Sequence, residues 1–322
     1  MTPGAPFHLD VAEAPAGAAA YWLTASDGMR LRAVVWQGGR RGTAVVFPGR
    51  TEFAEKYGRV IGELVARELS VLVIDWRGQG LSDRFRGKAM LGHVEDFRTY
   101  QHDVAALLAL EAALDLPAPR YLVAHSMGGC IGLRTLLERG EFSGAVFSAP
   151  MWQLQMKAAT RELTAKVTHF ANAVGLGARL MPGARAKPTP IAYGFERNVL
   201  TSDRDVFGWC LNQITAHPEL AIGGPSMQWT YAALEEMARL YVAPLPKIPM
   251  LVLMGTEETV VSPSVIRSQV AKMAEGELVM LEGARHEVFM EQPEIREQIW
   301  RRIDAFLDAA PTRRGYSAAA GS

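Results

Sequence analysis

The feature that most constrains the fold of this chain is a repeated alternation of short apolar runs with longer segments of helical periodicity. Runs this short and this apolar are typical of strands that are buried on both faces of a sheet. A strand–helix alternation predicts a mostly parallel sheet flanked by helices, with right-handed crossovers. The apolar runs of the first half lie at residues 44–47, 71–75, 121–125 and 145–148, and the helical segments between them include 54–69 and 100–114.

Two further groups of elements complete this α/β pattern. Near the start of the chain, apolar runs at 21–24 and 31–36 flank Ser26-Asp27-Gly28, a turn signal that predicts a hairpin. Toward the C-terminus the strand–helix alternation resumes. There the expected strands are 250–254 and 277–281, and the expected helices are 263–273 and 294–307.

The stretch between these two parts has a different texture. It carries no strand signals and is broken repeatedly by Gly and Pro, which predicts an inserted, mostly helical unit. We therefore expect a core built from residues 1–150 and 245–310, a helical cap insertion at 151–244, and a disordered tail at 311–322.

The composition excludes several classes of protein. The 322 residues include 34 basic and 34 acidic side chains, so the chain lacks the basic surplus typical of nucleic-acid binding. The N-terminal sequence lacks the pattern of a secretory signal, and no apolar run is long enough to span a bilayer. The two cysteines, Cys130 and Cys210, fit a reducing compartment. We expect a cytoplasmic location.

The most informative segment for function is residues 122–129, LVAHSMGG. An apolar strand runs into Ser126, and small residues lie two positions to either side of it, Ala124 and Gly128. Such a strand–turn–helix needs small neighbours and leaves the serine hydroxyl exposed at the turn. The alternative, a Gly-rich turn selected for packing alone, is less consistent with this context. Ser126 is thus the candidate nucleophile.

A nucleophilic serine needs a histidine to take its proton and an acid to orient that histidine. In this architecture the chain order is Ser, acid, His. His286 follows the expected strand 277–281, and Glu257 and Glu258 follow the expected strand 250–254. The carboxyl ends of parallel strands are where such sheets gather active groups. We expect His286 as the base and favour Glu258 over Glu257 as the acid.

An acyl-transfer site also needs donors for the developing oxyanion. The backbone N–H of Met127, directly after Ser126, supplies one. The second is expected from the loop that follows strand 44–47, where Arg50 is the best candidate and Gly49 lets the backbone approach the substrate.

Across about 21–307, these segments resemble the α/β-hydrolase superfamily, specifically its lysophospholipase and monoglyceride lipase branch. Carried over residue by residue, the resemblance implies Ser126 as nucleophile, Glu258 as acid, His286 as base, and Arg50 and Met127 as oxyanion donors. This sequence departs from the family pattern at two positions. Pro48 stands where many relatives have His, which resembles the bacterial lysophospholipases more closely. Glu258 stands where Asp is commoner. The resemblance rests on residues 47–52 with 56–57, 75–82, 124–129, 255–261 and 283–286.

The cap insertion supplies candidates for an acyl pocket. Aromatic side chains suit irregular apolar ligands, and Trp152, Phe195 and Trp229 are the candidates for substrate binding, although each could equally pack the cap onto the core. Apolar residues between 163 and 174 recur at helical spacing, which predicts a face buried in the cap. Peripheral membrane contact through this face is the alternative.

These inferences converge on a serine hydrolase that cleaves carboxylic ester bonds of a single-chain lipid, a lysophospholipid or a monoacylglycerol. The reaction would pass through an acyl-enzyme on Ser126 and would need no metal or organic cofactor. Three alternatives stay open: an aminopeptidase or an acyltransferase that uses the same three residues, and a homologue that binds ligands without catalysis.

Overall fold

The computed structural model describes residues 4–188 and 194–309. Its strands are β1 Ala19–Thr24, β2 Arg30–Trp36, β3 Thr43–Phe47, β4 Ser70–Asp75, β5 Arg120–His125, β6 Gly144–Ser148, β7 Met250–Gly255 and β8 Gly276–Leu281. They form one sheet in the order β1-β2-β4-β3-β5-β6-β7-β8. β1 and β2 form an antiparallel hairpin and β2 pairs antiparallel with β4, whereas all pairs from β4 to β8 are parallel. The predicted hairpin and mostly parallel sheet are confirmed.

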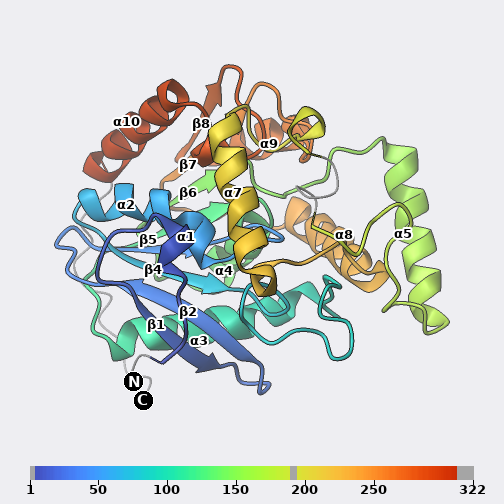
Figure 1. Ribbon diagram of the computed structural model, residues 1–322. Coiled ribbons are helices and arrows are strands. Elements are labelled where there is room, and N and C mark those ends of the chain that lie inside the picture. Colours follow the sequence, from blue (N-terminus) through green and yellow to red (C-terminus); the bar gives the residue numbers. More distant parts are fainter. Residues whose placement is uncertain (1–3, 189–193, 310–322) are drawn as a thin grey trace, which may run out of the picture.

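Helices cover both faces of this sheet (Figure 1). One face packs against α2, Gly58–Ala66, and α10, Pro293–Ala309. The other packs against α3, Tyr100–Ala113, α4, Met127–Glu138, and α9, Pro263–Val270. Shorter elements are α1, Leu9–Ala12, and single 3₁₀ turns at Ala54–Tyr57, Phe97–Thr99, Phe195–Arg197, Pro218–Leu220 and Val288–Met290.

The core lies in two layers because successive side chains of a strand point to opposite faces. In β3, Val45 and Phe47 join the apolar cluster that includes α3 and α4, whereas Ala44 and Val46 join the cluster that includes α2 and α10. All five residues of β3 are buried. A strand covered on both faces requires an apolar residue at nearly every position, which is why the sequence shows unbroken apolar runs rather than alternation.

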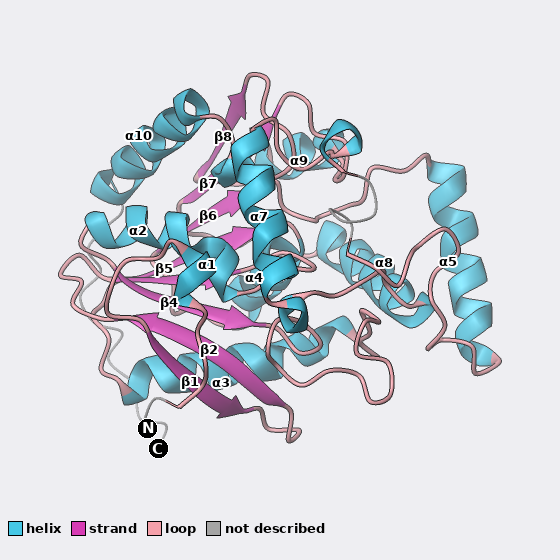
Figure 2. Cartoon of the chain, viewed as in Figure 1, coloured by secondary structure: helices cyan, strands magenta, loops and turns pink. Residues whose placement is uncertain are grey.

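Three long helices lie between β6 and β7 in the chain: α5, Ala158–Ala173, α7, Arg204–Ala216, and α8, Met227–Val242. The starts of α7 and α8 are defined locally, since Asp203 caps α7 by accepting from two backbone N–H groups and Ser226 caps α8 by accepting from the N–H of Trp229. The central strands point toward the side of the molecule on which α8 and α5 lie (Figure 2). The predicted tail at 311–322 lies outside the described residues.

The apolar face of α5 is not buried, and the prediction that it forms cap core is wrong. α5 is the outermost helix on its side and packs against α8 (Figure 1) through the opposite face, which buries Thr168 and Ala171. Helical periodicity identifies an apolar face but not whether another element covers it. The exposed fractions are 62% for Leu163, 42% for Val167, 67% for Phe170 and 50% for Val174. No helix among the described residues combines the length and apolar character needed to cross a bilayer.

The turn between β5 and α4 places the start of α4 directly on the backbone at the end of β3. Ser126, between these elements, has φ 49° and ψ −115°, a conformation that non-glycine residues rarely adopt. A Cβ atom added to Gly128 would lie 2.1 Å from the carbonyl oxygen of Phe47, well inside contact distance. Glycine at 128 is therefore required for this packing.

The Gly128→Ala substitution should destabilise the fold by about 2–4 kcal/mol, because the clash is with backbone that cannot move without shifting β3. Gly208→Ala, on α7, is the matched control. A Cβ there has no heavy atom within 4 Å, and replacing a helical glycine should raise stability by roughly 0.5–1 kcal/mol. Denaturant unfolding of both variants measures the difference. Equal stability of the Gly128→Ala variant and the unaltered protein would contradict the close approach.

Candidate active site

Ser126 and His286 lie within hydrogen-bonding distance although they are far apart in the chain. Ser126 is held at the strained turn after β5, and His286 lies in the loop that follows β8. The distance from Ser126 Oγ to His286 Nε2 is 2.9 Å, and both side chains are buried. A hydroxyl at this distance from an imidazole nitrogen can pass its proton to that nitrogen.

Glu258 lies on the far side of the His286 ring. Its Oε2 is 2.6 Å from His286 Nδ1, and its Oε1 accepts from the N–H groups of Val260 at 2.5 Å and Val261 at 3.1 Å. Burial raises the pKa of Glu258, but the hydrogen bond and charge of His286 and these two N–H donors lower it further, so the pKa lies below its usual range. The carboxylate is therefore ionised and oriented toward His286.

The neighbouring Glu257 points elsewhere. It is 58% exposed on its side chain, and its Oε2 lies 3.6 Å from Nε of Arg285 in a solvent-accessible ion pair. Of the two acids left open by the sequence, Glu258 is the one that the structure brings to His286.

The two predicted oxyanion donors lie on the loop after β3 and at the start of α4. Among the hydrogen bonds of the described residues, none is donated by the backbone N–H of Arg50 or of Met127, so both remain available to a ligand. Gln79 braces the loop on each side of Arg50: its Oε1 accepts from the N–H of Thr51 at 2.9 Å, and its Nε2 donates to the carbonyl of Gly49 at 3.1 Å. Since that carbonyl and the Arg50 N–H share one planar peptide unit, the bond to Gly49 also fixes where the N–H points.

A buried polar network that the sequence reasoning did not identify lies beside these groups. Lys56 Nζ is 2.7 Å from both Glu52 Oε1 and Glu287 Oε1. Glu52 Oε2 accepts from the hydroxyl of Tyr57 at 2.6 Å and from the N–H of Gly49. The charges of Lys56 and His125 overcome the effect of burial and lower the pKa of Glu52 to about 2. Glu52, Lys56 and Tyr57 lie in segments on which the resemblance rests, but none of them was given a role.

His125 completes this network. Its Nδ1 lies 2.9 Å from the hydroxyl of Ser148, and its ring centroid lies 4.9 Å from that of His286. Burial lowers the pKa of His125 to about 4, so the imidazole is neutral at physiological pH. Glu52, His125 and Glu287 bring ligand atoms within 4.8 Å of one another. The Lys56 ammonium already occupies the space between the two carboxylates, which disfavours a metal cation there.

A cavity of about 360 Å³ opens over Ser126 and His286. Trp229 lines it, as the sequence suggested, whereas Trp152 and Phe195 are not among the described residues that do. Trp152 packs on Phe147 and donates to the carbonyl of Gly129, and Phe195 packs on Phe207. The other large apolar side chains on its wall are Phe53, Met151, Leu154, Val199, Leu200, Ile214, Ile222 and Val260.

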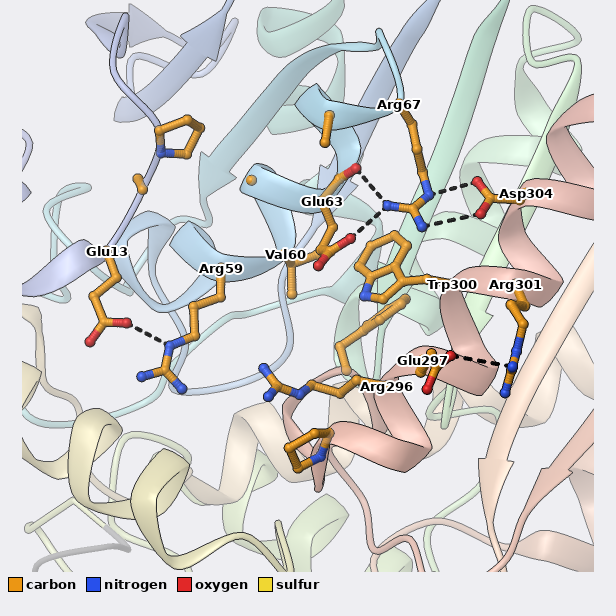
Figure 3. Close-up of a pocket in the computed structure, with 16 residues that line it drawn as sticks. Glu13, Arg59, Val60, Glu63, Arg67, Arg296, Glu297, Trp300, Arg301 and Asp304 are labelled. Carbon is orange, nitrogen blue, oxygen red and sulfur yellow. Dashed lines mark hydrogen bonds and ion pairs between the residues drawn. The ribbon is translucent and has the colours of Figure 1, made fainter.

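A larger hollow, of about 720 Å³, lies between α2 and α10 (Figure 3). Most of its charged side chains are paired with one another, since Arg67 binds Glu63 and Asp304, and Arg59 binds Glu13. The described residues that line it include no Ser, Cys or His. It therefore offers no nucleophile, and the smaller cavity is the candidate active site.

Comparison with known proteins identifies relatives of this chain. The chain matches the family described as serine aminopeptidase S33 over residues 38–293. It is similar to the probable lysophospholipase L2 of Haemophilus influenzae, with 28% identity over 267 residues that cover 82% of this chain and 83% of the relative. It is also similar to human monoglyceride lipase, with 25% identity over 306 residues that cover 91% of each protein.

Among solved structures, a soluble variant of monoglyceride lipase from Saccharomyces cerevisiae superposes with a TM-score of 0.71 at 20% identity, covering 90% of this chain and 95% of that chain. This likeness and the eight-stranded sheet confirm the predicted α/β-hydrolase fold. Because the family match spans well over half of the sequence, the chain belongs to the serine aminopeptidase S33 family of α/β-hydrolases, in its lysophospholipase-like branch.

Proposed function

We propose that this protein is a serine hydrolase that cleaves a carboxylic ester bond of a single-chain lipid through an acyl-enzyme on Ser126. The observation that carries the proposal is the continuous chain of hydrogen bonds from Ser126 through His286 to Glu258, at the wall of a cavity large enough for a ligand. We take residues 151–244 as the cap that covers this cavity.

The reaction follows from the positions of these groups. His286 Nε2 accepts the Ser126 proton as Oγ attacks the ester carbonyl carbon, and Glu258 stabilises the imidazolium that forms. The N–H groups of Arg50 and Met127 bind the tetrahedral oxyanion. His286 then gives the proton to the departing alcohol, which leaves an acyl-enzyme. Water attacks this ester with His286 again as base, and the fatty acid is released as Ser126 regains its proton.

The class of reaction has independent support. The comparisons confirm the prediction of a carboxylic ester hydrolase, since the relatives from several organisms are named lysophospholipase or monoglyceride lipase. Apolar side chains such as Leu154, Ile222 and Trp229 line the cavity and suit an acyl chain.

An aminopeptidase is the rival that the family description raises. Such an enzyme needs a free carboxylate to bind the substrate's α-ammonium group. The two carboxylates in the cavity wall, Glu52 and Glu287, both bind Lys56 instead, and the guanidinium of Arg50 adds a positive charge. These charges favour an ester substrate over an aminoacyl amide. Turnover of p-nitrophenyl laurate and of an aminoacyl p-nitroanilide distinguishes the two activities.

The Ser126→Ala variant should lose ester turnover by about 10⁴-fold or more, because the nucleophile is removed while the fold is kept. Labelling by a fluorophosphonate probe should also disappear, and the melting temperature should stay close to that of the unaltered protein. Ser264→Ala, which alters an exposed serine on α9, is the matched control and should keep both ester turnover and probe labelling. Labelling that survives in the Ser126→Ala variant would overturn the assignment of the nucleophile.

Substitution of the two adjacent acids tests the orienting role of Glu258. Glu258→Gln should lower kcat by about 10³- to 10⁴-fold, since a neutral amide no longer stabilises the imidazolium and can favour the wrong tautomer. Glu257→Gln, which removes only an exposed ion pair with Arg285, should change kcat by less than about threefold. Steady-state kinetics on a soluble ester measures both. Comparable losses in the two variants would show that Glu258 has no special role.

We also propose that the exposed face of α5 docks on a membrane surface that contains anionic lipids. Its apolar side chains protrude from the outermost helix of the cap, where they can enter the interface between head groups and acyl chains. Residues 157–187, which include α5, carry six basic side chains and one acidic one, whereas the whole chain is balanced, so positive charge is concentrated in this stretch of the chain. A cytoplasmic location stays a prediction. The basic residues are Lys157, Arg161, Lys166, Arg179, Arg185 and Lys187.

The double substitution Leu163→Ser with Phe170→Ser should weaken binding to phosphatidylglycerol vesicles by about tenfold or more, because two exposed apolar side chains no longer enter the interface. The ratio of turnover on vesicle-embedded ester to turnover on a short soluble ester should fall with it. Leu9→Ser, which alters a leucine of similar exposure on α1, is the control. Vesicle sedimentation measures binding, and unchanged sedimentation of the double variant would contradict the docking face.

A further inference from the structure

The side chain of Arg50 occupies an unusual position. Its backbone N–H donates no hydrogen bond among the described residues, and Arg50 lines the same cavity as Ser126. Nη2 donates to the carbonyl of Gly223 at 2.6 Å, and Cζ lies 5.3 Å from the ring centroid of Trp229. The Nε atom is buried and has no hydrogen-bond partner among the described residues.

Three enclosed arginines, Arg32, Arg77 and Arg84, show how this protein compensates a buried guanidinium. Arg32 binds the carboxylates of Glu55 and Asp75, and Arg77 binds those of Asp103 and Asp27. Arg84 has no carboxylate partner, but it donates to the carbonyl groups of Gly80, Ala89, Glu219 and Ala221. Arg50 has no carboxylate partner and donates to a single carbonyl group, that of Gly223. A cation held in this way is costly unless a ligand supplies the missing negative charge.

The surroundings of Arg50 reinforce this point. Burial lowers the pKa of its guanidinium to about 10, with only a small opposing effect from Tyr100, so the group is still charged at physiological pH. The carboxylates in the cavity wall, Glu52 and Glu287, are both held 2.7 Å from Lys56 Nζ. Lys56 is thus already paired, and Arg50 is the cation in the described part of the cavity wall that lacks an anionic partner.

We propose that the guanidinium of Arg50 binds the head-group phosphate of a lysophospholipid whose ester lies at Ser126. This inference rests on the proposed ester hydrolysis and selects between its two substrate classes, because a monoacylglycerol carries no anion. Arginine suits the task, since its planar donors match a phosphate and remain charged. In a lysophospholipid the phosphate lies only a few bonds from the ester. One residue can therefore bind both groups, because its backbone N–H can donate to the developing oxyanion while its side chain donates to the phosphate.

The test compares two substrates of equal acyl chain, lauroyl lysophosphatidylglycerol and monolauroylglycerol, both below their critical micelle concentrations. The unaltered protein should prefer the lysophospholipid. Arg50→Met removes the charge but keeps the length of the side chain, and the ratio of kcat/KM for lysophospholipid to that for monoacylglycerol should fall by about 10- to 100-fold, mainly through KM. Arg50→Lys should restore part of the ratio. Lys88→Met, which removes an exposed cation outside the cavity wall, should leave the ratio unchanged.

A second measurement uses only the unaltered protein and stays decisive if the variants fold poorly. sn-Glycerol 3-phosphate should inhibit p-nitrophenyl laurate hydrolysis competitively at concentrations about tenfold lower than glycerol does. Equal inhibition by the two compounds would overturn the phosphate site.

The remaining outcomes separate the possible failures. An unchanged substrate ratio in an Arg50→Met variant that still hydrolyses both esters would refute the inference and leave the proposed function intact. No turnover of either ester by the unaltered protein would refute the proposed function itself. The carboxylate of free laurate, a product of the reaction, is the other anion available to the Arg50 side chain. If Arg50→Met relieved inhibition by laurate without altering the substrate ratio, the site would bind the product carboxylate and the head-group assignment would be wrong.

Discussion

The first turn of α4 and the end of β3 approach so closely that no side chain fits between them. A Cβ at Gly128 would lie 2.1 Å from the carbonyl oxygen of Phe47 and 2.6 Å from that of Pro48. This contact fixes the start of the helix that carries the Met127 N–H against the loop that carries the Arg50 N–H. The strained Ser126 directly precedes this helix, so the proposed nucleophile and the proposed oxyanion donors lie on segments that pack against one another.

Buried ion pairs connect the loop that carries His286 to these segments. Lys56 binds Glu52, on the loop after β3, and Glu287, which directly follows His286 in the loop after β8. The ammonium thereby connects the loop that carries His286 to the loop that carries Arg50. A buried pair of this kind is a poor source of net stability, because desolvation offsets its attraction, but it is strongly destabilising to break. We interpret the network as a device for relative position rather than for stability.

The strands were predictable because each depends on local sequence: a run such as 71–75, apolar at nearly every position, has few alternatives to a buried strand. Ser126, His286 and Glu258 followed from their places at strand ends. What the sequence did not reveal were properties set by contacts between distant segments. The apolar residues around Phe170 recur at the helical period, as predicted. The sequence did not show, however, that their face stays uncovered. Likewise, nothing in the sequence distinguishes Trp152 from Trp229 as a cavity residue, yet of these two only Trp229 lines the cavity.

The choice of Glu at position 258 illustrates how the fold rather than the chemistry sets the identity of a side chain. One carboxylate oxygen meets His286, while the other accepts from the N–H groups of Val260 and Val261 and so closes the turn after β7. An aspartate on the same backbone would be shorter by one methylene, so its carboxylate would lie farther from His286 unless the loop moved. Since β7 ends at Gly255, where a Cβ would lie 2.0 Å from the carbonyl oxygen of Ala284, this loop has little freedom to move toward the histidine. The longer side chain of glutamate spans the distance between the fixed end of β7 and His286.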